Sequence, residues 1–312
     1  MKKPFFSIII PSFNQGSLLQ KAIESVLNQS FKNYEIIVVD NYSTDNTNEI
    51  IKSFQKKINF YKIRNHGVIG KSRNIGIKKA KGKWLAFLDS DDIWMKNKLK
   101  ETHKLILKKN FDIICNAEWI SYNSNIIRKL WIYGPYKKNF FQYLLENGSC
   151  VSTSASTINR EFIFSHKIFF NEKKIFITAE DYDFFLNLAY KKAKFYFLNR
   201  PLGIHLFHKQ SASSNFKKHR KATLEVLKYH VFKLQKFNKN KDNLWLKINF
   251  FILTKDLLVK VSLKNIRLSI LYSLIKLALL RPVQFFLYIL KIIIKQMFQF
   301  FLFYFYLVLN FK

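Results

Sequence analysis

Cysteine is scarce in this chain of 312 residues, which contains only Cys115 and Cys150. Two cysteines without metal-type spacing exclude a disulfide scaffold and indicate a reducing compartment. A Gly-rich phosphate loop is missing too, since the first apolar segment is followed by the Pro11–Gly16 stretch. Hydrophobic residues nevertheless make up 49% of the chain, which supports a packed core and excludes wholesale disorder.

Acidic residues are also few, because 20 Asp and Glu stand against 53 Lys and Arg, for a formal net charge of +33. After Asp183 the chain holds 24 Lys and Arg and only three acidic residues. Such a balance indicates an anionic partner: nucleic acid, a membrane surface or a phosphorylated substrate. From about Leu244 the chain is strongly apolar as well, which nucleic-acid binding alone does not explain. An anionic membrane surface accounts for both properties.

Short apolar runs alternate with helical patterns along the first part of the chain. The predicted strands are Phe6–Ile10, Glu35–Val39, Ile58–Ile63 and Trp84–Leu88, and the predicted helices are Ser17–Asn28, a helix from Thr44 or Asp45 to about Phe54, and Lys71–Ala80. This alternation is typical of βαβ units. It predicts an α/β fold with a mixed, mainly parallel sheet flanked by helices.

The pattern loosens after about Asn97. We expect a helix at Lys98–Lys109, a strand at Asp112–Glu118, a loop-rich stretch to about Ser156, a helix at Asp181–Lys192, a short strand at Phe195–Leu198 that ends before Arg200-Pro201, and a basic helical stretch at Phe216–Phe237. Beyond it, Leu244–Leu280 and the segment from Val283 have the pattern of amphipathic helices lying in a membrane surface. The alternatives are one helix inserted into the membrane, or helices that pack on the catalytic domain or on a second chain.

Carboxylates follow two of the predicted strands. Asp40 closes the second strand, and Asp89, Asp91 and Asp92 follow the fourth. In an open α/β sheet, ligands bind outside the carboxyl ends of the strands. Three neighbouring carboxylates repel one another unless a cation lies among them, and Mg²⁺ or Mn²⁺ meets that need and bridges to phosphate oxygens. The alternative is an acidic turn that caps a helix beginning near Ile93.

Five segments in this order resemble family-2 glycosyltransferases. They are Ser7–Asn14, Glu35–Asp45, Gly70–Gly76, Trp84–Asp92 with its Asp-x-Asp motif, and Ala179–Asp183. The resemblance spans about residues 7–213 and implies a GT-A-like fold. It also implies two halves of a catalytic domain: residues 1–97 bind the nucleotide sugar and residues 98–215 the acceptor. From their composition, residues 216–312 are expected to form a basic, apolar helical region that associates with a membrane.

The resemblance implies roles for single residues around the donor. Asp40 is expected to contact the base or ribose of the sugar nucleotide, and the turn that contains Pro11, Ser12 and Asn14 to line the same pocket. Asp89 is expected to face the ribose and the diphosphate.

A divalent metal, Mg²⁺ or Mn²⁺, is implied on that diphosphate, with Asp91 as a ligand and Arg73 nearby. His208 resembles a late histidine of the family that lies near the metal, although His205 competes for this role and either can be a surface histidine.

Asp181 matches the residue that supplies the catalytic base in the family, and Glu180 and Asp183 remain alternatives. A carboxylate that interacts with the dipole of a helix N-terminus is the other interpretation of Asp181. A single base that deprotonates the acceptor hydroxyl implies direct displacement, and therefore inversion at the anomeric carbon. Polymerising family members carry a Gln-x-x-Arg-Trp motif, and no Trp of this chain follows an Arg. We therefore expect transfer of one or a few sugars.

Together these features predict an inverting glycosyltransferase of bacterial surface polysaccharide biosynthesis, such as capsule or lipopolysaccharide. It would act on a glycan or lipid-linked acceptor while bound peripherally to the cytoplasmic face of the membrane, without a nucleic-acid partner. One alternative is a nucleotidyltransferase, which shares the sheet and the metal but would favour a Gly-rich loop. The other is a non-enzymatic binder of nucleic acid or anionic surfaces, whose binding would be salt-sensitive.

Overall fold

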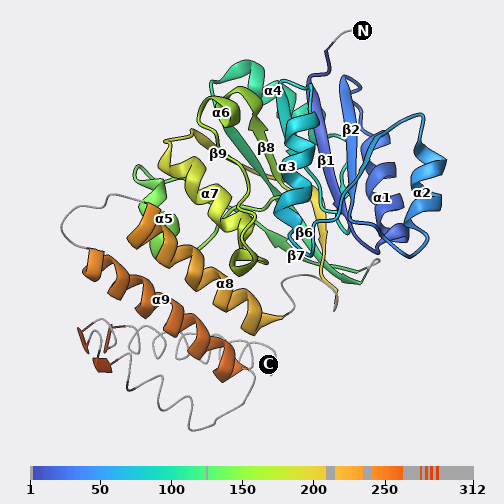
Figure 1. Ribbon diagram of the computed structural model, residues 1–312. Coiled ribbons are helices and arrows are strands. Elements are labelled where there is room, and N and C mark those ends of the chain that lie inside the picture. Colours follow the sequence, from blue (N-terminus) through green and yellow to red (C-terminus); the bar gives the residue numbers. More distant parts are fainter. Residues whose placement is uncertain are drawn as a thin grey trace, which may run out of the picture. The chain divides into compact units, whose positions relative to one another are not determined.

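The computed structural model describes residues 3–123, 126–208, 215–234 and 241–262, together with isolated positions between 275 and 287 (Figure 1). The chain divides into two compact units, Met1–Leu234 and Gln235–Lys312. The first unit contains the sheet and every residue predicted to form a site. Over the part of the chain that the structure describes, no helix combines the length and the apolar character that a membrane span requires.

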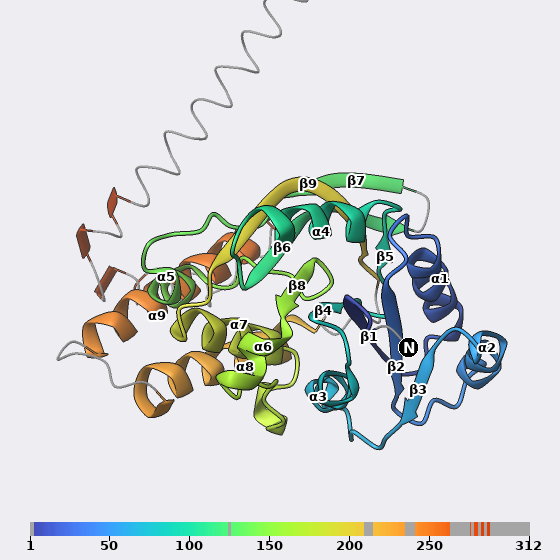
Figure 2. The ribbon, with the colours of Figure 1, turned by 90° about the horizontal axis from the view of Figure 1, so that it is seen from above.

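A mixed sheet forms the centre of the first unit, in the order β3-β2-β1-β4-β8-β6-β9-β5 with β7 paired to β6 (Figure 2). The strands are β1 Phe6–Ser12, β2 Tyr34–Asp40, β3 Asn59–Lys62, β4 Trp84–Phe87, β5 Ile93–Trp94, β6 Ile113–Asn123, β7 Ile126–Trp131, β8 Ser156–Asn159 and β9 Phe195–Leu206. The first four strands of this order are parallel, as predicted. Antiparallel pairs begin where β8 joins β4.

Helices cover both faces of this sheet (Figure 1). They are α1 Gly16–Leu27, α2 Thr47–Phe54, α3 Ile69–Lys79, α4 Lys98–Lys108, α5 Phe140–Asn147, α6 Arg160–Ser165, α7 Glu180–Tyr190 and α8 Phe216–Lys228. Side chains of a strand alternate between the two faces. Ile8 and Ile10 accordingly share one core cluster with buried residues of α1, α2 and α4, whereas Ile9 faces α3.

A close approach of α3 to β1 depends on Gly76. A Cβ atom at this position would overlap the side chain of Ile9, so only glycine allows the helix to lie this near the strand. The same face of the sheet holds α7, because Phe87 of β4 packs edge-to-face against Phe184, with ring centroids 6.2 Å apart. As a result, α3 and α7 lie on one face, and Arg73 of α3 can reach the start of α7.

The last strand differs from the prediction. β9 does not end before Pro201 but continues to Leu206 beside β6. The register shifts where Leu198 pairs with Asn116 and Pro201 with Ala117, so that two extra residues bulge out of the ladder. A bulge removes the need for a backbone N–H at the proline, which is why the strand survives it.

Other elements of the second half were also not predicted in full. The stretch expected to be loop-rich contains β7, α5 and β8. The basic helix from Phe216 is α-helical to Lys228 and continues as a π-helical turn, η3 Tyr229–Leu234, while residues 235–240 lie outside the described residues. In the second unit, α9 Lys241–Ser262 confirms a helix at the start of the apolar region. Its continuation, including nearly all of the segment from Val283, also lies outside them.

Candidate active site

The carboxyl ends of β1 and β2 bring the first predicted site residues together. Ser12 and Asp40 are register partners at the ends of these strands. The backbone N–H of Asn14 donates to Ser43 Oγ at 2.8 Å, and Asn14 Oδ1 accepts from Thr44 N at 2.8 Å. The two turns that follow β1 and β2 are therefore tied to each other.

Buried polar groups line this edge of the sheet. Asp40 is fully buried, and its carboxylate accepts a 3.0 Å bond from Ser43 N and a further bond from the Ser43 hydroxyl. Ser12 is only 4% exposed, and its Oγ has no hydrogen-bond partner among the described residues. A buried hydroxyl without a partner is costly, so a ligand group that binds it would recover a hydrogen bond.

Aromatic rings stand exposed above the same turns. Phe13 is 54% and Tyr42 45% exposed. The Lys62 ammonium and the Arg64 guanidinium lie 5.1 Å and 4.7 Å from the centre of the Tyr42 ring. Planar rings and cations beside buried oxygens are groups that can bind a nucleotide.

Arg73 joins two of the predicted motifs. Its Nη2 lies 2.7 Å from Asp89 Oδ1 after β4, and its Nη1 lies 2.9 Å from Glu180 Oε1 at the start of α7. The arginine side chain is 4% exposed, and although this burial lowers its pKa, the two carboxylates outweigh the effect and raise the pKa above its usual value. The guanidinium thus connects α3 with α7, since Arg73 and Glu180 are 107 positions apart in the sequence.

Asp91 and His208 meet on the other side of the Asp-x-Asp turn. His208 Nε2 lies 2.8 Å from Asp91 Oδ2, and both side chains are partly exposed, at 26% and 17%. Burial, and next the neighbouring charge of Asp89, raise the pKa of Asp91. His205, the competing histidine, faces the buried Asp92 instead, with its Nδ1 3.0 Å from Asp92 Oδ1.

Asp181 lies next to the Arg73 cluster in the first turn of α7. Its Oδ1 accepts from the Tyr182 backbone N–H at 2.8 Å. Burial is the largest influence on Asp181 and raises its pKa, while the charges of Arg73 and His219 act in the opposite direction. The structure therefore places a carboxylate with an elevated pKa beside Asp89 and its neighbours.

The two alternative carboxylates of α7 are more deeply buried. Glu180 is 5% exposed and binds both Arg73 and the backbone N–H of Thr178, at 2.9 Å each. Asp183 is 1% exposed and lies 2.8 Å from His230 Nε2. Both are engaged within the protein, whereas Asp181 is half-buried.

The described residues contain no group of three or more His, Cys, Asp or Glu side chains arranged to hold a metal. Asp91 and His208 are the predicted residues whose ligand atoms converge. Adjacent ligands of an octahedral ion, each 2.0–2.1 Å from the metal, are about 2.9 Å apart. Mg²⁺ sites often use one or two protein ligands and complete the shell with phosphate oxygens and water. The pair fits such an ion.

Several contacts of the site have no counterpart in the sequence analysis. Ser90 of the Asp-x-Asp turn donates to Gln15 Oε1, and Ser154 Oγ accepts from the Asp89 backbone N–H at 3.0 Å. His219 of α8 hydrogen-bonds through Nδ1 to the Thr178 carbonyl at 2.7 Å. These partners come from distant segments, and His219 sits in a run of basic residues, so the sequence carries no signal for them.

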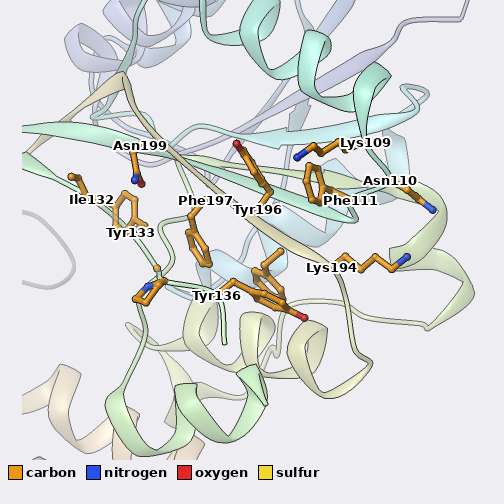
Figure 3. A pocket seen from close by; sticks show the side chains of 13 residues that line it. Lys109, Asn110, Phe111, Ile132, Tyr133, Tyr136, Lys194, Tyr196, Phe197 and Asn199 are labelled. Atoms are coloured by element: carbon orange, nitrogen blue, oxygen red, sulfur yellow. The ribbon is translucent and has the colours of Figure 1, made fainter. Parts of the chain in front are cut away.

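A cavity opens at the other end of β9, away from these residues (Figure 3). It has a volume of about 840 Å³ and is lined by residues that precede β6, follow β7 and begin β9. The ring of Phe111 stacks on Tyr196 at 4.6 Å between centroids, and Lys109 and Lys194 flank the rings (Figure 3). None of the predicted site residues lines this cavity.

Comparison with protein families gives one match over half of the chain. The family model described as "Glycosyl transferase family 2" matches residues 7–164. This range contains the turns after β1 and β2, Arg73 and the whole Asp-x-Asp turn. It ends before Asp181 and His208.

Curated relatives include the glycosyltransferase GlyG of Streptococcus pneumoniae serotype 4, which is 30% identical over 152 residues, 48% of this chain and 46% of GlyG. The Escherichia coli UDP-Glc:alpha-D-GlcNAc-diphosphoundecaprenol beta-1,3-glucosyltransferase WfgD is 36% identical over 124 residues, 39% of this chain and 49% of WfgD. An uncharacterized glycosyltransferase of Methanocaldococcus jannaschii is 29% identical over 83% of this chain and 90% of its own. Of GlyG and WfgD, this chain spans less than half the length.

Among solved structures, Staphylococcus aureus TarS 1-349 in complex with UDP-GlcNAc has a TM-score of 0.63 and 19% identity, over 90% of this chain and 82% of that chain. At this identity the likeness concerns the fold. The GT-A-like α/β architecture predicted from the sequence is confirmed.

Proposed function

The chain belongs to glycosyl transferase family 2, and we propose that it transfers a sugar from a nucleoside diphosphate sugar to a hydroxyl of a glycan or lipid-linked acceptor. The observation that carries this proposal is the Arg73 bridge. It holds Asp89 of the predicted donor-binding half and Glu180, the neighbour of the proposed base, on one guanidinium. Donor diphosphate and acceptor hydroxyl must meet at such a junction for transfer to occur.

The donor nucleotide would bind at the carboxyl ends of β1 and β2. Pro11, Ser12 and Asn14 line this edge, and the unpartnered Ser12 hydroxyl is available to a ribose or base. Asp40 is buried beneath them and holds Ser43, which in turn binds the Asn14 backbone. We therefore propose that Asp40 acts on the donor chiefly by fixing the turn that contacts it.

Asp91 and His208 would hold Mg²⁺ or Mn²⁺ against the donor diphosphate. A divalent ion there supplies positive charge to the leaving diphosphate. The bond to Arg73 fixes the orientation of Asp89. Since Asp89 and Glu180 share one guanidinium, the cluster keeps a net negative charge that favours a cation nearby.

Asp181 would accept the proton of the acceptor hydroxyl as the oxygen attacks the anomeric carbon. Its raised pKa suits this role, because a base whose pKa lies nearer the working pH takes up a proton more readily. Glu180 and Asp183 are already bound to Arg73 and His230, which leaves them less able to do so. With one base and direct displacement, the product has the inverted anomeric configuration.

The named relatives support a proposal for the donor and acceptor classes. WfgD uses UDP-Glc and a diphosphoundecaprenol-linked sugar, and TarS was solved with UDP-GlcNAc. We propose a UDP-sugar and a sugar-diphospho-polyprenol for this chain, in bacterial surface polysaccharide biosynthesis. The basic, apolar region from about Leu244 would then hold the enzyme on the anionic cytoplasmic face of the membrane, near that acceptor.

A thermal-shift panel tests the donor. The full chain is heated with UDP-Glc, UDP-GlcNAc or a GDP-sugar, each with MnCl₂ or with excess chelator. A bound donor stabilises the fold in proportion to the logarithm of its concentration over its Kd. We expect one sugar nucleotide to raise the Tm only when the metal is present. No shift with any of them would contradict the proposal.

Binding to anionic vesicles tests the proposed membrane association. Because apolar contacts are insensitive to salt, high salt should release the full-length chain from anionic vesicles only in part, and a chain that ends at Leu234 should not bind them. A full-length chain that remains unbound and monomeric without detergent would contradict the proposed location.

A further inference from the structure

Asp92 connects the Asp-x-Asp turn to the end of β9. Its side chain is buried, with 1% exposed. Oδ1 accepts a 3.0 Å hydrogen bond from the Leu206 backbone N–H and lies 3.0 Å from Nδ1 of His205. One carboxylate therefore holds two consecutive residues of β9, at the place where the strand ends.

His208 stands two residues beyond this contact. Its Nε2 lies 2.8 Å from Asp91 Oδ2, so the neighbouring carboxylates Asp91 and Asp92 bind the same short segment at two points. Asp91 is partly exposed and Asp92 is not. The outer contact, between Asp91 and His208, can accept a ligand. The inner contact, between Asp92 and the end of β9, fixes the backbone that carries His208.

Opposite charges can strengthen the inner contact, between Asp92 and His205. The Asp92 carboxylate lies 3.0 Å from the His205 imidazole, so a protonated imidazole makes this contact charge-assisted. Glu118 of β6 is also buried in this part of the sheet, and its Oε2 accepts a 2.7 Å hydrogen bond from the Tyr133 hydroxyl. Charge-assisted hydrogen bonds are stronger than neutral ones, which suits a contact that fixes the backbone.

We propose that Asp92 is a positioning residue, which fixes the end of β9 so that His208 stays beside Asp91 and both can bind the metal on the donor diphosphate. This inference rests on the proposed function, since it concerns the same ion. Asp92 itself would touch neither the metal nor the nucleotide. Its loss should therefore act entirely through His208.

A double-mutant cycle on the full chain tests this dependence. The Kd of UDP is measured by calorimetry with MnCl₂ and with chelator, and bound Mn²⁺ is counted by electron paramagnetic resonance. Partners that orient a metal ligand typically contribute 10- to 100-fold to metal affinity, so D92A should weaken Mn²⁺-dependent UDP binding by about 10-fold or more. In the H208A background, D92A should change it by less than about twofold, because residues that act as a unit are not additive.

D92N is the second variant. Its amide oxygen can still accept from Leu206 N but carries no charge for His205, so its Kd should lie between those of the wild type and D92A. If D92A does not fold, D92N replaces it in the cycle. E118Q is the matched control, since it also removes a buried charge from this part of the sheet. It should lower the Tm without changing Mn²⁺-dependent UDP binding.

The inference would be overturned if D92A weakened Mn²⁺-dependent UDP binding equally with and without the H208A substitution. It would also be overturned if E118Q weakened this binding as much as D92A does. Neither result would affect the proposed function, which needs only wild-type binding. A wild-type chain that binds no UDP with Mn²⁺ would overturn both.

Discussion

The acidic residues of the site are held in two different ways. Asp89 and Glu180 are bound by one arginine whose side chain is 4% exposed, whereas Asp91 and Asp92 are each bound by a histidine. An arginine stays charged at every physiological pH and offers five donors in a rigid plane. A histidine is a common metal ligand and carries one or two protons. The arginine side is thus suited to permanent structure, and the partly exposed pair of the histidine side, Asp91 and His208, to exchange with a ligand.

The position of Asp181 sharpens this difference. It lies on the arginine side, where burial keeps its pKa high and Arg73 lowers it in part. The fixed side would therefore carry the proton transfer, and the exchangeable side would carry the metal and the leaving group. Variants on each side should accordingly fail in different steps.

Asp181→Asn should have the largest effect. Asparagine keeps the shape but cannot take a proton, so transfer should fall by roughly 10²–10⁴-fold while UDP binding survives. Product formation measures transfer, and calorimetric Kd values measure UDP binding. The control is Asp183→Asn, which disturbs the buried pair with His230 and should lower the Tm more than the turnover. Near-normal transfer by Asp181→Asn together with loss in Glu180→Gln would mean that another carboxylate is the base.

Asp91→Asn should lower turnover by roughly 10²–10³-fold, the range for removing one group that stabilises a developing charge. Excess chelator should reproduce this loss in the wild type and add little in the variant. Asp112→Asn is the control, because Asp112 binds the Lys194 backbone at the opposite end of β9. Full activity of the wild type in chelator would exclude the metal role.

Arg73→Met tests how much the arginine side of the site contributes to the free energy of unfolding. It leaves the buried Glu180 and the partly exposed Asp89 without a cation, and breaking a buried ion pair typically costs about 3–5 kcal/mol in the free energy of unfolding. Arg200→Met is the matched control, since Arg200 binds Glu101 on the surface with 55% of its side chain exposed, and should cost about 0–1 kcal/mol. Urea unfolding measures both. Equal losses would show that the guanidinium at Arg73 is no more important than a surface one.

The smallest effect is expected from acidification, which should lower the rate of transfer by the wild-type chain. Because the pKa of Asp181 is raised, its carboxylate takes up a proton at a higher pH than an ordinary aspartate, whose pKa is about 3.9. The rate should therefore decline on acidification from a pH above that value, as the base becomes protonated. A profile of kcat/KM against pH reports the free enzyme. A rate that stays constant down to pH 4 would argue against Asp181.

The sequence predicted the parallel half of the fold well and the antiparallel half poorly. Buried parallel strands are continuous apolar runs, such as Phe6–Ile10, and their helices have a clear period. β8 lacks such a run, and in β9 Pro201 seemed to end a strand that a bulge in fact continues. Pairing across a sheet depends on distant partners, which local patterns do not contain.

The sequence likewise predicted some features of the site and not others. The sequence placed Asp40 and Asp89 at strand ends, and the Asp-x-Asp spacing pointed to the pair that meets His208. It expected Arg73 near Asp89 but gave no sign that the same arginine also binds Glu180. Nor did it separate Asp91, which faces outward, from Asp92, which is buried. Such roles depend on which way each side chain points, and that is decided by packing.

A crystal structure of the chain with UDP and Mn²⁺ tests the central claim most directly. The account predicts the nucleotide on the turns after β1 and β2, and the ion on Asp91 and His208 against the diphosphate, with Arg73 still bound to Asp89 and Glu180. Nucleotide in the aromatic cavity at the other end of β9, or an ion bound away from Asp91, would contradict it.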